Sequence, residues 1–155
     1  MTTHEQMTCE IQADLFELST EKFSCSSPFF ISRYMQSDIV KELDNVDDPY
    51  NFLSPHNLIV LMNSNYPSLK KKKGLKYPKP VIRWIGYMYR AYALIKKEQS
   101  KKIYESLPAE KMLTLYETFH TFSTEYCVEQ LEGIISQNKK TVDEYALFKK
   151  VMQMK

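Results

Sequence analysis

Three residues that could do chemistry, Arg83, Tyr87 and Arg90, lie four and three positions apart in the sequence. They fall in or just before WIGYMYRAYALI at 84–95, a stretch that is otherwise almost entirely apolar or aromatic. On a helix this spacing places all three on one face. An arginine inside a helical bundle is costly unless it is paired, so we expect Arg90 to have a partner on another element. The candidates are Glu105, Glu117, Tyr104 and His120.

The residues alone leave two interpretations of Arg90 open. In the first, Arg90 belongs to a structural polar network that locks helices together. In the second, it lines a groove and binds a partner's carboxylate or a phosphate, because the guanidinium fork matches planar acceptors. In either case we predict that Arg90, Tyr104 and His120 lie near one another. An enzyme centred on these three residues would need a polar pocket and a carboxylate such as Glu105 or Glu117 within reach.

The sequence lacks the signatures of the common catalytic classes. It contains no GxSxG, Walker, GxGxxG or HExxH motif. A ribonuclease of the HEPN type would have a histidine four to six residues after an arginine, and Arg33, Arg83 and Arg90 have none at that distance. The three histidines and three cysteines are never at metal-ligand spacing. We therefore predict a protein that is not an enzyme and uses no metal or other cofactor.

A run of lysines offers a different chemistry. Phosphate backbones bind to such runs, and the flanking Tyr66 and Tyr77 could stack on bases. A solvated loop, or one that meets an acidic protein, is the other interpretation. The candidate anion-binding residues are Lys70, Lys71, Lys72, Lys73, Lys76 and Lys79.

Length and composition limit the fold. A chain of 155 residues with 43% hydrophobic residues is long enough for one domain with a real core. Only 3 glycines and 7 prolines argue against a turn-rich β sandwich or barrel. No apolar run approaches the length of a membrane span, and the N-terminus does not read as a secretory signal. The odd number of cysteines favours a reducing compartment, so we predict a cytoplasmic protein without a membrane partner.

Charge is segregated along the chain. Residues 1–66 carry 3 basic and 10 acidic side chains, whereas residues 67–107 carry 12 basic and 2 acidic ones. Residues 108–155 are nearly neutral, with 6 basic and 7 acidic side chains. This pattern predicts a polarised surface, which favours charged partners.

The hydrophobic periodicity is helical throughout, and no segment alternates as a strand would. We predict an all-α single domain over residues 1–155, with six or seven helices packed around a buried helix at 80–97. Residues 67–79 are expected to form an exposed basic connector within it. Ser27, Asp38 and Ser54 are expected to cap helices. We expect two helices at the C-terminal end, one beginning at Ser123 or Thr124 and one beginning at Thr141.

Three stretches together resemble a group of small bacterial proteins found in toxin–antitoxin and mobile-element neighbourhoods. They are FSCSSPFFISRYMQS at 23–37, WIGYMYRAYALIKKEQSKKIYESLP at 84–108 and MLTLYETFHTFSTEYCVEQLEGI at 112–134. The group shares a CSSxxFIxR start, a WIGYxYR helix, an SKxIY turn and an HT pair. Its order and spacing are matched here by Cys25, Ser26, Ser27, Phe30, Ile31, Arg33, Met35, Trp84, Gly86, Tyr87, Tyr89, Arg90, Ser100, Lys101, Ile103, Tyr104, His120 and Thr121.

The resemblance implies an antitoxin-like function. Such a protein is a non-catalytic helical module that neutralises a cognate toxin by binding it, and the resemblance admits an ADP-ribosyltransferase-like enzyme as that toxin. The chain departs from the pattern at Ala91 and Tyr92, where Tyr-Trp is more usual, and at Phe119, where a tyrosine usually precedes the histidine. The alternative function is a nucleic-acid-binding regulator that uses the lysines at 70–79.

Overall fold

The computed structural model describes residues 1–45, 54–71 and 73–154. In these residues the chain forms eight α-helices and one short 3-10 helix, and no strand, so the all-α prediction is confirmed. The count is slightly above the six or seven helices expected from sequence. The elements are α1 (Thr3–Lys22), α2 (Ser27–Met35), α3 (Asp38–Asp44), α4 (Pro55–Asn65), η2 (Pro67–Lys70), α5 (Lys79–Lys96), α6 (Ser100–Ser106), α7 (Ala109–Phe119) and α8 (Thr124–Gln153).

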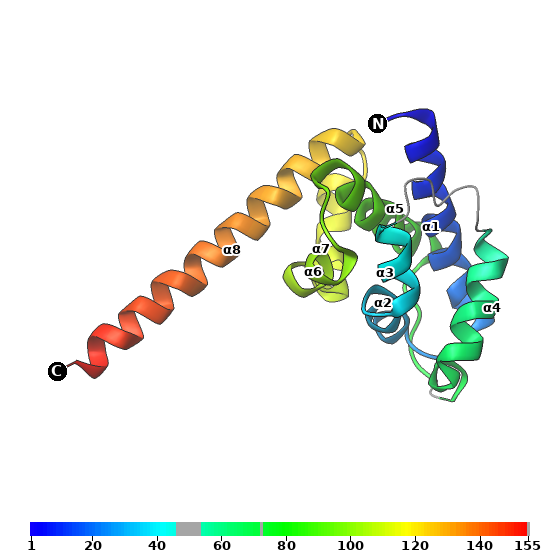
Figure 1. Ribbon diagram of the computed structural model, residues 1–155, viewed down its shortest axis with the longest axis horizontal. Helices are drawn as coiled ribbons and strands as arrows, with labels where there is room; N and C mark the ends of the chain where they lie inside the picture. The colour runs from blue at the N-terminus through cyan, green and yellow to red at the C-terminus, as the bar shows by residue number, and fades with distance from the viewer. Residues whose placement is uncertain (46–53, 72, 155) are drawn as a thin grey trace.

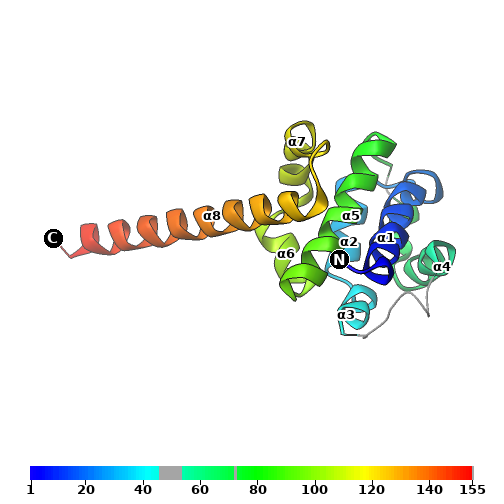
Figure 2. The ribbon, with the colours of Figure 1, turned by 90° about the horizontal axis from the view of Figure 1, so that it is seen from above.

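Helix α5 lies at the centre of the body, as its nearly all-round apolar sequence predicts. It contacts α1, α6, α7 and α8 (Figures 1 and 2). Pro80 lies in its first turn, and Lys97 ends it in the left-handed conformation with φ 52°. The side chains of Ile82, Ile85 and Tyr89 are almost completely buried in the core.

Helices α1 and α5 approach each other closely, and their contact depends on Gly86. A Cβ at this position would lie 2.7 Å from Cγ of Phe16 and 2.9 Å from the carbonyl oxygen of Gln12. The Gln12 amide donates a 2.9 Å hydrogen bond back to the Gly86 carbonyl. The glycine in the WIGYMYR stretch therefore allows the two backbones to meet.

Serines cap several helices, but not always the serines expected. Ser54 and Ser123 accept from the backbone at the starts of α4 and α8, as predicted. Helix α2 is capped by Ser26 rather than Ser27, and α3 by Ser37 rather than Asp38. The correction at α2 has a physical reason, because the Ser27 hydroxyl accepts from the backbone N–H of Tyr77 at 2.8 Å instead.

The predicted connector at 67–79 is mostly exposed, yet it is held against the turn between α1 and α2. Backbone hydrogen bonds join Gly74 to Ser24 and join Leu75 to Ser27. A Cβ at Gly74 would lie 2.6 Å from Cβ of Ser26, so the two segments touch. Lys72 lies outside the described residues.

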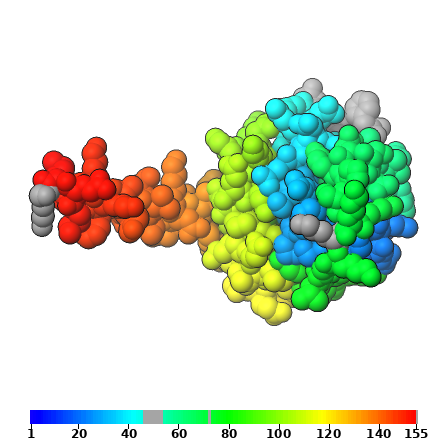
Figure 3. All heavy atoms as spheres, turned by 90° about the horizontal axis from the view of Figure 1, so that it is seen from below, coloured from blue at the N-terminus to red at the C-terminus, as the bar shows by residue number. Residues whose placement is uncertain are grey.

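The C-terminal helix is the largest departure from the sequence prediction. Two helices were expected, from Ser123 and from Thr141, but α8 runs without interruption from Thr124 to Gln153. Every residue from 136 to 154 is exposed, and we call this segment the arm. It projects from the rounded body as a single helix (Figures 1–3). None of the helices in the described part of the chain is long and apolar enough to span a membrane.

Candidate functional site

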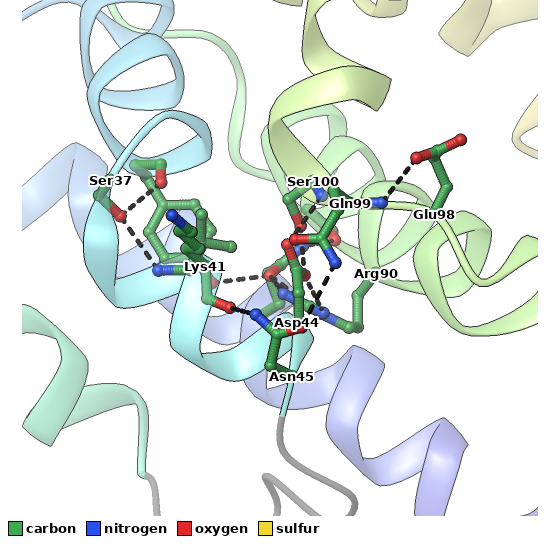
Figure 4. A network of polar contacts seen from close by, with 12 residues as sticks. Ser37, Lys41, Asp44, Asn45, Arg90, Glu98, Gln99 and Ser100 are labelled. Carbon is green, nitrogen blue, oxygen red and sulfur yellow. Dashed lines mark hydrogen bonds and ion pairs between the residues drawn. The ribbon is translucent and has the colours of Figure 1, made fainter.

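The structure pairs Arg90 with Asp44, which belongs to α3 (Figure 4). Arg90 Nη1 donates to Asp44 Oδ1 at 2.8 Å, and each side chain is only 3% exposed. Asp44 also accepts from the backbone N–H of Ser100 at 2.8 Å and from its hydroxyl at 2.7 Å. One carboxylate thus neutralises the buried arginine and caps the start of α6, where Gln99 makes no side-chain cap.

The other side of the Arg90 guanidinium contacts Gln12 of α1. The Gln12 Oε1 atom accepts from Arg90 Nη2 at 3.0 Å and from the Tyr34 hydroxyl at 2.7 Å. Burial raises the pKa of Tyr34 to about 12, so this hydroxyl stays protonated and can donate. A small cavity of about 20 Å³ adjoins Arg90, Gln12 and Tyr34, which is room for about one water molecule.

This geometry corresponds to the structural interpretation of Arg90. Its partners are Asp44 and Gln12 rather than the expected Glu105, Glu117, Tyr104 or His120. Among the described residues, no buried side-chain nitrogen or oxygen lacks a hydrogen-bond partner. The guanidinium therefore has its carboxylate within the fold, and the network joins five helices (α1, α2, α3, α5 and α6).

Arg83 lies on the same α5 face but at its half-exposed end, and it contacts three carboxylates of α1: Glu10, Asp14 and Glu17. Lys79, one turn earlier, pairs with Glu21 of the same helix. The acidic first third of the chain and the basic middle third thus meet at the α1–α5 contact. Some of the oppositely charged side chains that are segregated in the sequence therefore pair with each other across this contact.

Tyr104 and His120 do not join this network. No hydrogen bond or ion pair links either of them to Arg90 in the described structure. Tyr104 is half-buried against the core. The exposed His120 ring stacks on Tyr116 with 4.2 Å between ring centroids, and its Nδ1 lies 2.7 Å from the Tyr116 carbonyl oxygen. Tyr87 is half-buried near the start of α8, and burial raises its pKa.

Aromatic side chains gather where α7 turns into α8, and we call this surface the aromatic corner. Trp84 meets Tyr116 edge to face at 5.8 Å between centroids, and Phe122 meets Tyr126 at 5.0 Å. Phe122 is 51% exposed and Tyr126 is 46% exposed. Trp84, Phe119 and His120 stand out in the sequence, but the sequence does not predict this cluster, because the cluster forms only when the turn between α7 and α8 brings their ends together. The corner consists of Trp84, Tyr116, Phe119, His120, Phe122 and Tyr126.

The candidate anion-binding lysines have different surroundings in the structure. The Lys76 ammonium donates to the backbone carbonyls of Phe23 and Cys25, and Lys79 is paired with Glu21. The exposed ones are Lys70, Lys71 and Lys73. The strongest concentration of positive charge in the sequence is therefore divided between structural contacts and a short exposed turn.

The hollows in the described surface include a shallow one of about 580 Å³ beside α3, lined by Asp38, Lys41, Glu42 and Asn45, and two others that are described next. One of these two, of about 460 Å³, lies between α3 and α6 and is lined in part by Lys41, Asp44 and Lys102. The other, of about 280 Å³, lies where α8 leaves the body beside Tyr92 and Ile103. Within the described residues there is no group of three or more His, Cys, Asp or Glu side chains that could hold a metal ion.

Comparison with known proteins adds no family to this description. No family model, no curated protein and no solved structure matches the chain. The resemblance to antitoxin-like proteins therefore rests on the sequence motifs alone.

Proposed function

We propose that this chain is a non-catalytic, cytoplasmic protein-binding module of the antitoxin type, which neutralises a cognate toxin by direct contact. The aromatic corner carries the proposal. Aromatic side chains that are half exposed and clustered are typical of the energetic centre of a protein–protein interface. Trp84, His120 and Thr121, three of the residues that carry the resemblance, lie in or beside this corner.

The corner is also held rigid before any partner arrives, which lowers the entropic cost of binding. The Phe122 backbone N–H donates to the Phe119 carbonyl at 3.0 Å, and Ser123 caps the start of α8. The Cys127 thiol, which is buried beneath the turn, lies 3.1 Å from the same carbonyl. The turn between the two helices therefore presents Phe122 and Tyr126 from a fixed backbone.

The contacts of the residues on which an active centre would depend also favour a non-catalytic protein. The guanidinium groups of Arg83 and Arg90 are held by carboxylates of the body. His120 has no carboxylate among its hydrogen-bond partners, which are its own helix and Tyr116. An active centre built on Arg90, Tyr104 and His120 therefore receives no support from the geometry.

The test is co-expression with the protein encoded beside this chain, followed by tag purification and native mass spectrometry. We expect a stoichiometric complex and relief of the neighbour's toxicity in a growth assay. Replacing both Phe122 and Tyr126 by alanine should weaken binding at least about tenfold, as loss of hot-spot residues does. Leu61→Ala on α4 is the matched control, since Leu61 is 41% exposed and lies away from the corner.

Two outcomes would contradict the proposal. One is a chain that purifies without a protein partner and leaves toxicity unchanged. The other is co-purified nucleic acid whose binding falls steeply with salt and is lost when Lys70, Lys71 and Lys73 are replaced by glutamate. The second outcome would establish the nucleic-acid-binding regulator in place of the antitoxin.

A further inference from the structure

The arm exposes an unusual amount of apolar surface for a helix that touches nothing else. Seven large apolar side chains in it are between 47% and 79% exposed. Most of a helix's stability in a protein comes from packing of its apolar face against other elements, and contiguous exposed apolar patches mark interaction sites. The seven are Val142, Tyr145, Leu147, Phe148, Val151, Met152 and Met154.

Four of these side chains form one stripe. At about 100° per residue, Val142, Tyr145, Phe148 and Met152 fall within an arc of roughly 120°. Leu131, Ile134 and Ile135 lie on the same face one to three turns earlier, and there they pack against the body. The stripe is thus a continuation of a core-facing surface beyond the point where the body ends. Leu147 lies on the opposite face.

The body has a hollow at the foot of the arm, where the end of a partner helix could bind. The hollow of about 280 Å³ between α6, the end of α5 and the foot of α8 has Tyr92, Ile103 and Ile135 in its lining. Ile135 and Lys139 border both this hollow and the stripe. A helix laid along the stripe toward the body would therefore end at the hollow.

We propose that the occupant is a second copy of this chain, whose arm lies antiparallel along the stripe with its tip at the hollow. The body already occupies the stripe's face as far as Ile135, so a parallel partner would have to place its own body in the same space. An antiparallel partner places its body beyond the tip of the first arm. Tyr145 then lies near the two-fold axis, with Val142 close to Phe148 of the partner.

The size of the contact is sufficient for a specific dimer. Burying the exposed parts of the two aromatic and two aliphatic side chains of the stripe from each copy removes on the order of 1,000 Å² from water in total. That value lies near the lower bound for a specific protein–protein interface, and insertion of the tip into the hollow adds to it. A self-complementary patch of this kind is what a two-fold dimer requires.

The first measurement is the mass of the full-length chain by sedimentation velocity over a range of concentrations. We expect twice the monomer mass of 18.3 kDa. Phe148→Glu should raise the dimer dissociation constant by about 30-fold or more, because it places a charge in the apolar seam. Leu147→Glu is the matched control: the two side chains are 62% and 63% exposed, but Leu147 lies on the other face.

The direction of pairing is tested with pyrene attached to Met154→Cys. The natural cysteines Cys9, Cys25 and Cys127 are buried, so the label goes to the tip. Antiparallel arms hold the two tips roughly 25 Å apart, at 1.5 Å per residue, and no excimer fluorescence is expected.

A dimer with strong excimer emission would overturn the antiparallel arrangement. A monomer at about 100 µM, or a dimer equally weakened by Leu147→Glu, would overturn the pairing through the stripe. Neither result touches the aromatic corner, so binding of the neighbouring gene product by a monomeric chain would leave the proposed function standing.

Discussion

At the scale of single residues, the buried pair of Arg90 and Asp44 is a point where loss of one side chain should destabilise the body. Removing one partner leaves an uncompensated charge away from water. We predict that Asp44→Ala lowers the free energy of unfolding by about 3–5 kcal/mol. Part of this loss comes from the α6 start, because the Ser100 N–H and hydroxyl lose their acceptor. Urea unfolding followed by circular dichroism measures the change.

Two control variants distinguish the cost of leaving a buried charge unpaired from the cost of losing an ordinary ion pair. Lys79→Ala breaks the exposed pair with Glu21 and should cost less than about 1 kcal/mol. The double variant Asp44→Leu with Arg90→Met replaces the pair by apolar side chains and should recover most of the loss. If Asp44→Ala cost no more than Lys79→Ala, the pair would not have the structural role assigned to it.

The sequence shows that Arg90 needs a partner but not which one. Asp44 lies 46 positions away, in a short helix that reads as an ordinary acidic surface segment. In the sequence, Gln12 looks like a polar position on the exposed face of an amphipathic helix. In the structure it is only 2% exposed, and its side chain accepts hydrogen bonds from both Arg90 and Tyr34. Pairings between distant helices depend on how the helices are arranged, and local periodicity contains no information about that arrangement.

At the scale of elements, local signals were most informative where they were strongest. The central helix predicted at 80–97 is observed at Lys79–Lys96, because its apolar run and the early Pro80 both mark it. The prediction for the C-terminal end was right that the segment is helical but wrong that it is divided into two helices. Residues 136–140 are polar, but no proline or glycine lies between Gly133 and the helix end. Such residues can remain helical in an exposed arm.

The contact between α1 and α5 can be tested through its glycine. Gly86→Ala would place a Cβ within 3 Å of Phe16 and of the Gln12 carbonyl, so the helices must separate or Phe16 must move. We predict a loss of about 1–3 kcal/mol in the free energy of unfolding, as overpacking of a core produces. The measurement is chemical unfolding.

Gly133→Ala in α8 is the matched control for this prediction. A Cβ there meets nothing within 4 Å, and alanine is favoured over glycine inside a helix by up to about 1 kcal/mol. The two substitutions should therefore have opposite signs. A stabilising Gly86→Ala would show that the two backbones are not in close contact.

At the scale of the whole molecule, the chain divides into a body that holds its own core and an arm that does not. Three basic side chains of the region 67–107 pair with carboxylates of the acidic region 1–66 within the body: Lys79, Arg83 and Arg90. Besides exposed lysines such as Lys70, Lys71 and Lys73, two apolar surfaces are left for partners: the aromatic corner at one end of α8 and the stripe along its arm. Two separate surfaces allow one copy to hold both a second copy and a different protein.

This division predicts how the chain responds to loss of the arm. All residues from 136 to 154 are exposed and bury nothing on the body, so a chain that ends at Ser136 should keep its fold. At low concentration its melting temperature should lie within about 2 °C of the full-length value, because a change below about 0.5 kcal/mol shifts it no further. Thermal unfolding followed by circular dichroism measures both chains.

The dependence of the melting temperature on protein concentration distinguishes stabilisation by pairing of the arms from the stability of the body itself. If the arms pair, dimerisation stabilises the folded full-length chain by mass action, and its melting temperature rises with protein concentration. The shortened chain has no stripe from Val142 to Met152, so its melting temperature should stay constant over the same range. A shortened chain that unfolds at all concentrations would mean that the arm supports the body directly. Its exposed placement argues against that, because a helix stabilises a body only through the surface that it buries there.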